Sequence, residues 1–349
     1  MMPSPGRIVV FQTAFAGDVI LTVPLVEALR KLFHDILIDF VAIPSGAEVL
    51  ANHPALNHVI VYDKKGKDKG LLPALSLARE LRRVKYYAAL IPHRSLRSAA
   101  ICCLAGIQRR IGFDTSAGRW LFSDEVRYSK DGHEIARNLS LLRPLGHEGE
   151  RMEIPRLYPS TEDMQRVSEV VGWRESENLI ALAPGSVWAT KRWLEERFCE
   201  LASQLIKDGF SVALVGGRED QQLGIRLEHE ISHERLVNVI GKFTLLQSAE
   251  LIRRAKVLVT NDSAPMHLAV AMRTPVVAIF GATVPAFGFA PLGEHDVVVE
   301  TDGLKCRPCG IHGGNSCPIK TFDCMKNIQT GHVLEKVHGI LSRLGVEVG

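Results

Sequence analysis

The chain has 349 residues, of which 46% are hydrophobic and 23% charged, with 42 Lys and Arg against 39 Asp and Glu. This length predicts about two domains with a core each, and this composition excludes a disordered chain. Seven cysteines are too few for a disulfide-rich secreted scaffold of this size, and their odd number favours the reducing cytosol.

Basic side chains are concentrated in the first half of the chain. Residues 64–110 hold twelve Lys and Arg against two Asp and Glu. Such a cluster attracts phosphates or an anionic membrane surface, although part of it is typical of a solvated helix face. Few aromatic side chains are interleaved for stacking on bases, so we expect a small or lipidic anionic partner and no nucleic acid.

Short apolar runs alternate with helical patterns along the whole chain. The runs that predict strands are 8–12, 36–43, 59–62, 88–92, 179–183, 211–215, 257–260 and 276–280. Amphipathic stretches such as 26–33, 197–207 and 249–255 predict helices between them. Residues 274–293 carry no charge, but prolines and glycines interrupt them, so this stretch indicates a strand and a loop.

This alternation predicts parallel sheets with helices on both faces, which is the α/β class. Two such series divide near residues 155–160 and predict two doubly wound, Rossmann-like domains that face a cleft. We expect an N-terminal domain over 1–157, a C-terminal domain over 158–330 and a last helix within 331–349. The chain lacks the dinucleotide fingerprint, the Walker A loop, the nucleophile elbow and the Asp-x-Asp pair, which excludes an ordinary dehydrogenase, NTPase or hydrolase.

Ligands of doubly wound sheets bind just beyond the carboxyl ends of the strands. Asp18 follows the first expected strand, after Gly17 and before a helical pattern. This position suits an N-cap and a functional carboxylate equally. A catalytic base here requires a pKa raised by partial burial.

The first expected strand of the second domain, 179–183, leads into a Pro-Gly-Ser turn. Ser186 and the amides of this turn are candidates for binding phosphate oxygens, with Lys191 and Arg192 neutralising the charge. The alternative is the start of a surface helix. Glu219, which follows the next strand, is a candidate for ribose hydroxyls.

A second candidate anion site follows the strand at 257–260. The backbone amides of Ser263 and Ala264 open a helix there, and His267 lies in its first turn. The carboxylate of Asp262 is suited to accept bonds from sugar hydroxyls. A capping Asp and a core His are the alternative.

Together these segments resemble the ADP-heptose:lipopolysaccharide heptosyltransferases, which are inverting, metal-independent glycosyltransferases with two Rossmann-like domains (GT-B type). The matches follow the family order over nearly the whole chain: Gly17-Asp18 with Thr22 and Pro24, Arg97-Ser98-Ala99, Arg109 to Phe113, Ala183 to Ser186 with Lys191 to Trp193, and Asn261 to Ser263 with Met266 to Ala269. At Ala264 this sequence departs from the family, which usually has glycine there, and the added methyl narrows the expected donor site.

The resemblance implies that Asp18 is the base that deprotonates the acceptor hydroxyl. It implies that Lys191 and residues 263–267 bind the diphosphate of ADP-heptose and that Asp262 contacts the heptose. The acceptor would be Kdo or a heptose of the lipopolysaccharide inner core, or a lipid A precursor, at the cytoplasmic face of the inner membrane. The candidate acceptor-binding residues are Arg94, Arg97, Arg109 and Arg110. The alternatives are another nucleotide sugar, a different acceptor, or a nucleotide-sugar-binding protein without turnover.

Four cysteines near the end of the second domain are a candidate structural metal site. They are Cys306, Cys309, Cys317 and Cys324, with the spacing C-x₂-C and then seven and six residues. This pattern is typical of zinc and iron sites, and reduced thiols or labile disulfides are the alternatives. Four thiolates would leave no coordination position open for catalysis, and the resemblance implies that transfer requires no metal. A metal-sensing module would depend on this cluster alone.

Overall fold

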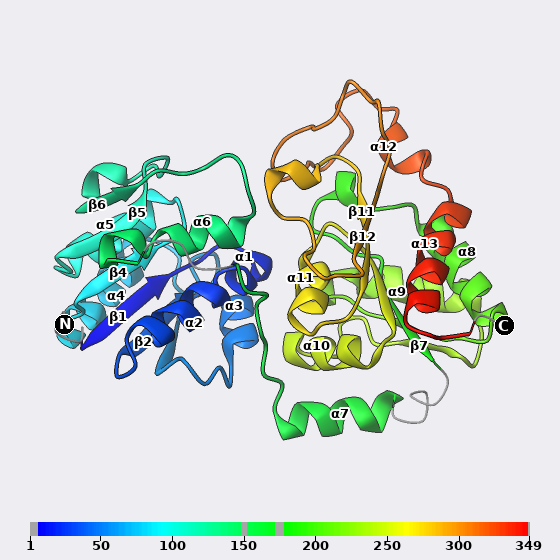
Figure 1. Cartoon of the computed structure of the whole chain (residues 1–349), viewed down its shortest axis with the longest axis horizontal. Coiled ribbons are helices and arrows are strands. Elements are labelled where there is room, and N and C mark those ends of the chain that lie inside the picture. Colours follow the sequence, from blue (N-terminus) through cyan, green and yellow to red (C-terminus); the bar gives the residue numbers. More distant parts are fainter. Residues whose placement is uncertain (1–5, 148–151, 172–177, 348–349) are drawn as a thin grey trace. The chain divides into compact units, whose positions relative to one another are not determined.

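The computed structural model describes residues 6–147, 152–171 and 178–347. The chain divides into two compact units, Met1–Tyr158 and Pro159–Gly349. Each unit contains one six-stranded parallel sheet with helices packed on its faces (Figure 1). The predicted α/β class with two doubly wound, Rossmann-like units is thereby confirmed.

In the first unit the strand order is β3-β2-β1-β4-β5-β6. The strands are β1 (Arg7–Phe11), β2 (Leu37–Ala42), β3 (His58–Val61), β4 (Ala88–Ile91), β5 (Arg109–Phe113) and β6 (Asp124–Val126). The helices are α1 (Ala16–Ile20), α2 (Val23–Leu32), α3 (Pro44–Leu50), α4 (Leu71–Val84), α5 (Leu96–Leu104) and α6 (Glu134–Ser140). Ile8 of β1 pairs with Ile38 on one side and with Ala88 on the other.

The second unit repeats this arrangement, with the strand order β12-β11-β10-β7-β8-β9. Its strands are β7 (Leu179–Ala183), β8 (Ser211–Leu214), β9 (Leu236–Asn238), β10 (Val257–Asn261), β11 (Val276–Phe280) and β12 (Val297–Glu300). Its helices are α7 (Thr161–Val171), α8 (Glu195–Lys207), α9 (Gln221–Ile231), α10 (Leu245–Arg254), α11 (Ala264–Ala271), α12 (Asp323–Lys326) and α13 (Thr330–Arg343). The last helix, α13, belongs to this unit, since Val333, Val337 and Ile340 lie in its core.

The central strands form where the sequence offers apolar runs, because strands buried on both faces consist mostly of apolar residues. All of β7 and β11 is buried, for example. Four strands were not predicted, namely β5, β6, β9 and β12, because they are short or begin with charged residues. The uncharged stretch 274–293 folds into β11 and the loop that follows it. In the described ranges no helix has both the length and the hydrophobicity of a bilayer span.

Both sheets reverse their strand order beside their first strand, between β1 and β4 and between β7 and β10. At such a switch point the two connections leave in opposite directions, which opens a crevice beyond the carboxyl ends of the strands. Each unit therefore offers one crevice to a ligand. The residues that follow β1, β4, β7 and β10 are the ones placed to line it.

Candidate active site

Asp18 is the third residue of the short helix α1, directly after β1. It is not the N-cap. Instead its Oδ2 accepts a hydrogen bond from the backbone N–H of Phe15 at 3.1 Å, inside the first turn. Burial, followed by the negative charge of Glu134, raises the pKa of Asp18 to about 6. A carboxyl group with such a pKa is a competent base near neutral pH.

The residues after β4 bring a polar cluster to the same edge of the sheet. His93 Nδ1 lies 3.1 Å from Thr13 Oγ1 and 3.0 Å from Ser98 Oγ. Burial, together with the positive charges of Lys64 and Arg94, lowers the pKa of His93 to about 4. The imidazole is therefore neutral at physiological pH, and it can donate one hydrogen bond and accept another without adding charge.

Glu134, the first residue of α6, acts electrostatically on Asp18 and is itself bound by two further residues. Its Oε2 accepts hydrogen bonds from Arg137 at 2.9 Å and from the hydroxyl of Tyr128 at 3.3 Å. The guanidinium of Arg94 lies over the ring of Tyr128, 4.4 Å from its centre. The charges near Asp18 thus have both signs, and burial with Glu134 outweighs Arg94 in setting its pKa.

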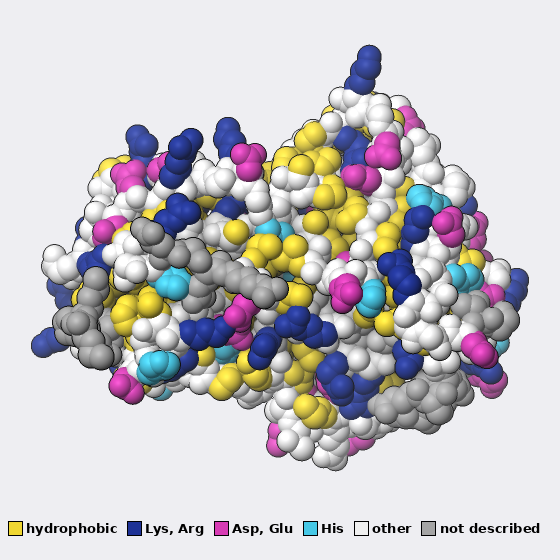
Figure 2. All heavy atoms as spheres, viewed as in Figure 1, with side chains coloured by type: hydrophobic (Ala, Val, Ile, Leu, Met, Phe, Trp, Pro, Cys, Tyr) yellow, Lys and Arg dark blue, Asp and Glu magenta, His cyan; other side chains and the backbone are white. Residues whose placement is uncertain are grey.

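The structure separates the four predicted acceptor-binding arginines. Arg94 follows β4 and Arg97 lies in the first turn of α5; both are exposed at the edge that carries Asp18. Arg109 and Arg110 begin β5 and pair with Ala88 and Ala89 of β4, at the amino end of the sheet. Their guanidinium groups donate to backbone carbonyls of Pro144, Ile107, Gln108 and Leu121. The geometry gives this second pair a structural role and does not bring it to the crevice. Figure 2 shows that Lys and Arg side chains project from the surface of the first unit.

In the second unit, Lys191 and Asp262 form a buried ion pair. Lys191 Nζ lies 2.6 Å from Asp262 Oδ2, and both side chains are nearly inaccessible to solvent. The hydroxyl of Thr283, just after β11, donates to the same oxygen at 2.6 Å. The loops after β7, β10 and β11 thus meet at one carboxylate. An ammonium group has three donors, so Lys191 can hold Asp262 and an anion together.

The start of α11 lies next to this ion pair. Ser263 is the N-cap, and its side chain makes no capping bond. Its buried Oγ has no hydrogen-bond partner among the described residues. Ala264 opens the helix, and His267 is buried in its first turn. A buried hydroxyl without a partner beside free helix amides is the arrangement expected of an anion site.

Asn261 fixes the turn after β7. Its Nδ2 donates to the carbonyl of Pro184 at 2.8 Å, and its Oδ1 accepts from the backbone N–H of Trp193 at 2.9 Å. Arg192 Nε donates to the carbonyl of the buried Ser186 at 2.7 Å. The candidates Ser186, Lys191 and Arg192 are therefore held together with Asp262 and Ser263. Glu219 is exposed after β8, at the same edge of the sheet.

Sequence reasoning missed Thr283, His93 and Glu134. Thr283 and His93 each follow a predicted strand within three residues, so a search of every strand end would have found them. Glu134 gives no such signal, because it reaches Asp18 only through the packing of α6.

The four candidate metal-binding cysteines are free thiols. Burial and then the charges of Cys306 and Cys317 raise the pKa of Cys309, and burial with the other three cysteines raises that of Cys324. Backbone N–H groups, that of Phe322 foremost, lower the pKa of Cys317. The four thiols are therefore neighbours. Within the described part of the chain, however, no three His, Cys, Asp or Glu side chains are placed to hold a metal ion.

Arg307 anchors this cysteine segment to the sheet. Its guanidinium donates to the carbonyls of Gly281, Thr283 and Thr301 and to the carboxylate of Glu300, and it is only 7% exposed. Thr283 is the residue whose hydroxyl binds Asp262. The segment thus supports the loop that completes the ion pair.

Replacing Arg307 by methionine leaves these acceptors without their donor. We expect the free energy of unfolding to fall by about 2–3 kcal/mol, measured by urea denaturation of the full chain. Arg343→Met is the matched control, since Arg343 donates to one carbonyl at an exposed helix end. An equal loss in both variants would contradict the anchoring role.

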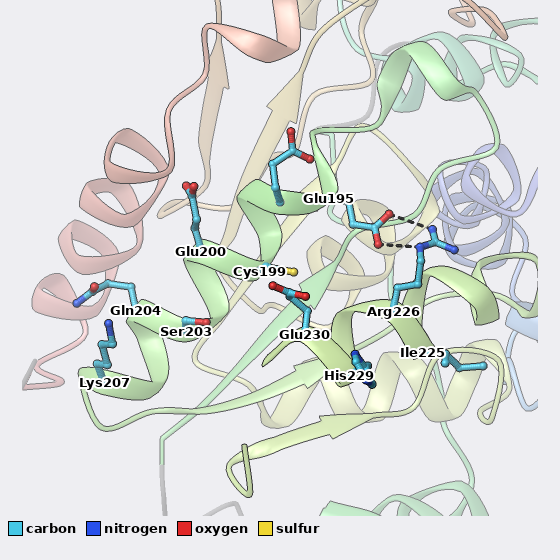
Figure 3. Close-up of a pocket in the computed structure, with 11 residues that line it drawn as sticks. Glu195, Cys199, Glu200, Ser203, Gln204, Lys207, Ile225, Arg226, His229 and Glu230 are labelled. Carbon is cyan, nitrogen blue, oxygen red and sulfur yellow. Dashed lines mark hydrogen bonds and ion pairs between the residues drawn. The ribbon is translucent and has the colours of Figure 1, made fainter. Parts of the chain in front are cut away.

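A surface hollow of about 1060 Å³ lies elsewhere, between α8 and α9 (Figure 3). Glu195 and Arg226 form a bidentate ion pair at its rim, 2.8 and 2.9 Å apart. Burial and the surrounding glutamates raise the pKa of Cys199 to about 11, so this thiol is not a nucleophile. The hollow is lined by residues of α8 and α9 and contains none of the candidate site residues.

Comparison with known proteins gives concordant matches. The model of glycosyltransferase family 9 (heptosyltransferase) matches residues 74–314. Lipopolysaccharide heptosyltransferase 2 of Salmonella typhimurium is 26% identical, over 97% of this chain and 100% of that protein. A family 9 glycosyltransferase from Veillonella parvula has a similar structure, with a TM-score of 0.88 and 24% identity over 98% of this chain and 99% of that one. The ADP-heptose LPS heptosyltransferase II of E. coli gives a TM-score of 0.81 at 24% identity, over 97% and 100% of the two chains.

Proposed function

The chain belongs to glycosyltransferase family 9, the heptosyltransferases, and we propose that it moves a heptose from ADP-heptose to the inner core of lipopolysaccharide. The assignment of ADP-heptose as the donor depends on the Lys191–Asp262 ion pair at the start of α11. It joins a cation, free helix amides and the unpartnered hydroxyl of Ser263 at one switch point. A diphosphate is the ligand that matches these groups.

The donor is bound in this proposal by residues from three loops. Lys191, Arg192 and the amides at Ser263 and Ala264 bind the diphosphate, with Ser186 and His267 beside them. Oδ2 of Asp262 accepts hydrogen bonds from Lys191 and Thr283. Its Oδ1 accepts a hydrogen bond from a hydroxyl of the heptose. Glu219 accepts the ribose hydroxyls.

Transfer with inversion requires one base, and Asp18 supplies it. The acceptor oxygen attacks the anomeric carbon while its proton passes to the carboxylate of Asp18. The bond from that carbon to the diphosphate oxygen breaks, and ADP leaves with the electron pair. Lys191, Arg192 and the α11 amides stabilise the charge that develops on the diphosphate, which is the role that a metal ion fills in other enzymes.

The acceptor is a lipopolysaccharide precursor in this proposal, with Kdo or a heptose as the receiving sugar, at the cytoplasmic face of the inner membrane. The relative from Salmonella is named for this class of acceptor. Arg94 and Arg97, exposed at the edge that carries Asp18, are suited to its carboxylates or phosphates.

The test is acceptor-dependent release of ADP. The full-length protein is offered ADP-heptose with heptose-deficient lipopolysaccharide, in parallel with UDP- and GDP-sugars. Release from ADP-heptose alone supports the proposal. Release with another nucleotide sugar would overturn the donor, and donor binding without any release would favour a nucleotide-sugar-binding protein.

The pH profile tests the base separately. Since Asp18 has a pKa of about 6 and acts as the carboxylate, kcat/KM is expected to fall about tenfold per pH unit below 6 and to level off above 7. The measurement is the initial rate of ADP release between pH 4.5 and 8.5 in buffers of constant ionic strength. A profile flat down to pH 5 would contradict the assignment.

A structural zinc or iron ion at Cys306, Cys309, Cys317 and Cys324 is a separate proposal. The spacing and the proximity of the four thiols support it. No three of the described side chains are placed for coordination, so the segment would have to contract around the ion. One equivalent of metal in the purified chain, lost in Cys306→Ser, supports the site; metal-free protein in which these four cysteines all react as free thiols refutes it.

A further inference from the structure

Two leucines at the start of α4 project almost fully into solvent. Leu71 and Leu72 are each 79% exposed, and Leu75 lies one turn further along the same exposed side. The opposite side of α4 is buried through Ala74, Leu77, Ala78 and Leu81. This helix needs only the buried side for its packing. Two adjacent leucines so exposed are therefore unexplained by the fold of the unit.

The loop that leads into α4 is rich in lysine. Lys65, Lys67 and Lys69 are exposed within residues 62–70. The two acidic side chains of the loop bind its backbone, and four lysines against two aspartates leave the loop with a net positive charge. Asp68 accepts from the N–H of Asp63, and Asp63 accepts from those of Gly66 and Lys67. These hydrogen bonds fix the backbone of the loop, and the three lysines are exposed to solvent.

This loop is connected to the helix of the proposed base. Lys64 Nζ lies 3.5 Å from Thr13 Oγ1, and Lys65 Nζ lies 5.3 Å from the centre of the Phe15 ring. Phe15 is the residue whose N–H binds Asp18, and its own ring is partly exposed. The exposed leucines, the lysines and the base therefore follow β3 and β1 at the same edge of one sheet.

We propose that Lys65, Lys67, Lys69, Leu71 and Leu72, here called the Lys–Leu patch, dock the first unit onto an anionic lipid bilayer. The lysines meet the phosphates of the headgroups, and the two leucines enter the boundary between headgroups and acyl chains. Charge complementarity favours this occupant, because exposed leucines directly after a lysine-rich loop suit a surface that is anionic outside and apolar beneath. The inference rests on the proposed function in one respect: an acceptor anchored in lipid would be presented at the edge that carries Asp18.

Vesicle binding by the full-length chain tests the patch without any turnover. Sedimentation is measured with phosphatidylcholine vesicles and with equal mixtures of phosphatidylcholine and phosphatidylglycerol. The variants are Leu71→Ser/Leu72→Ser and Lys67→Gln/Lys69→Gln. Ile225→Ser is the matched control, because Ile225 is also an exposed apolar residue on a helix, at 54%.

We expect the protein to bind the anionic vesicles in a salt-sensitive manner, and each double variant to bind at least about tenfold more weakly. Ile225→Ser should bind as the unmodified chain does. Unchanged binding in Leu71→Ser/Leu72→Ser would overturn the proposal. So would competition by millimolar inorganic phosphate, which would indicate a phosphate site, or a dimer that this variant dissolves, which would indicate a second copy as the occupant.

Turnover distinguishes this inference from the proposed function. Leu71→Ser/Leu72→Ser should use a water-soluble, deacylated acceptor at the normal rate and an acceptor embedded in vesicles about tenfold more slowly. Equal loss on both acceptors would overturn docking as the role of the leucines. If the unmodified chain transfers no sugar at all, the proposed function fails, and vesicle binding still decides the patch.

Discussion

Asp18→Asn is expected to lower kcat by about 10³-fold and to leave the affinity for ADP unchanged. Asparagine keeps the size of the side chain but cannot accept the proton of the acceptor hydroxyl. The measurements are steady-state ADP release and calorimetric titration with ADP. Asp131→Asn, which alters an exposed carboxylate of the same unit, should behave as the unmodified chain does. Normal turnover in Asp18→Asn would refute the proposed base.

The stability of Asp18→Asn should change in the opposite direction to its activity. The pKa of Asp18 is raised from 3.8 to about 6 on folding, so its stabilising contribution is complete below pH 4 and is lost as the pH rises through 6. Above that range the folded chain holds a partly buried carboxylate that the unfolded chain would keep in water. The variant should therefore have the higher Tm at pH 8, with a difference that disappears near pH 4. A lower Tm at pH 8 would mean that lost turnover reflects a damaged fold.

Lys191→Met is expected to lower kcat/KM for ADP-heptose by about 10²–10³-fold. The ammonium is the only group of the ion pair that can neutralise the diphosphate as ADP leaves. Both its binding and its transition-state roles disappear with the charge. Lys207→Met, at the exposed end of α8, is the matched control and should be neutral.

A double variant separates binding from folding at this ion pair. Lys191→Met alone leaves the buried carboxylate of Asp262 with the hydroxyl of Thr283, so the free energy of unfolding should fall by about 3 kcal/mol. Lys191→Met/Asp262→Asn removes the unpaired charge and should recover most of that loss. Donor use should remain low in both. If the double variant regains stability and activity together, the single variant lost activity through its fold.

Much of the fold can be predicted from the sequence, because buried parallel strands consist of nearly continuous apolar runs. The runs at 179–183 and 276–280 became β7 and β11 with the predicted bounds. The pattern fails for β5, which begins with Arg109 and Arg110. Charge at the start of a strand looks the same in sequence as charge in a binding loop. Only the register with β4 places these two arginines at the amino end of the sheet.

By itself the sequence determined the α/β class, the two units and the positions of Asp18, Lys191 and Asp262 at strand ends, since these depend on local patterns of polarity. The tertiary structure alone decided what those side chains can do. The pKa of Asp18 depends on burial and on Glu134 from another element, and Asp262 is held by Lys191 and Thr283 from two other loops. Desolvation and electrostatic interaction act between residues that are close in space, and which residues those are is decided by packing rather than by spacing along the chain.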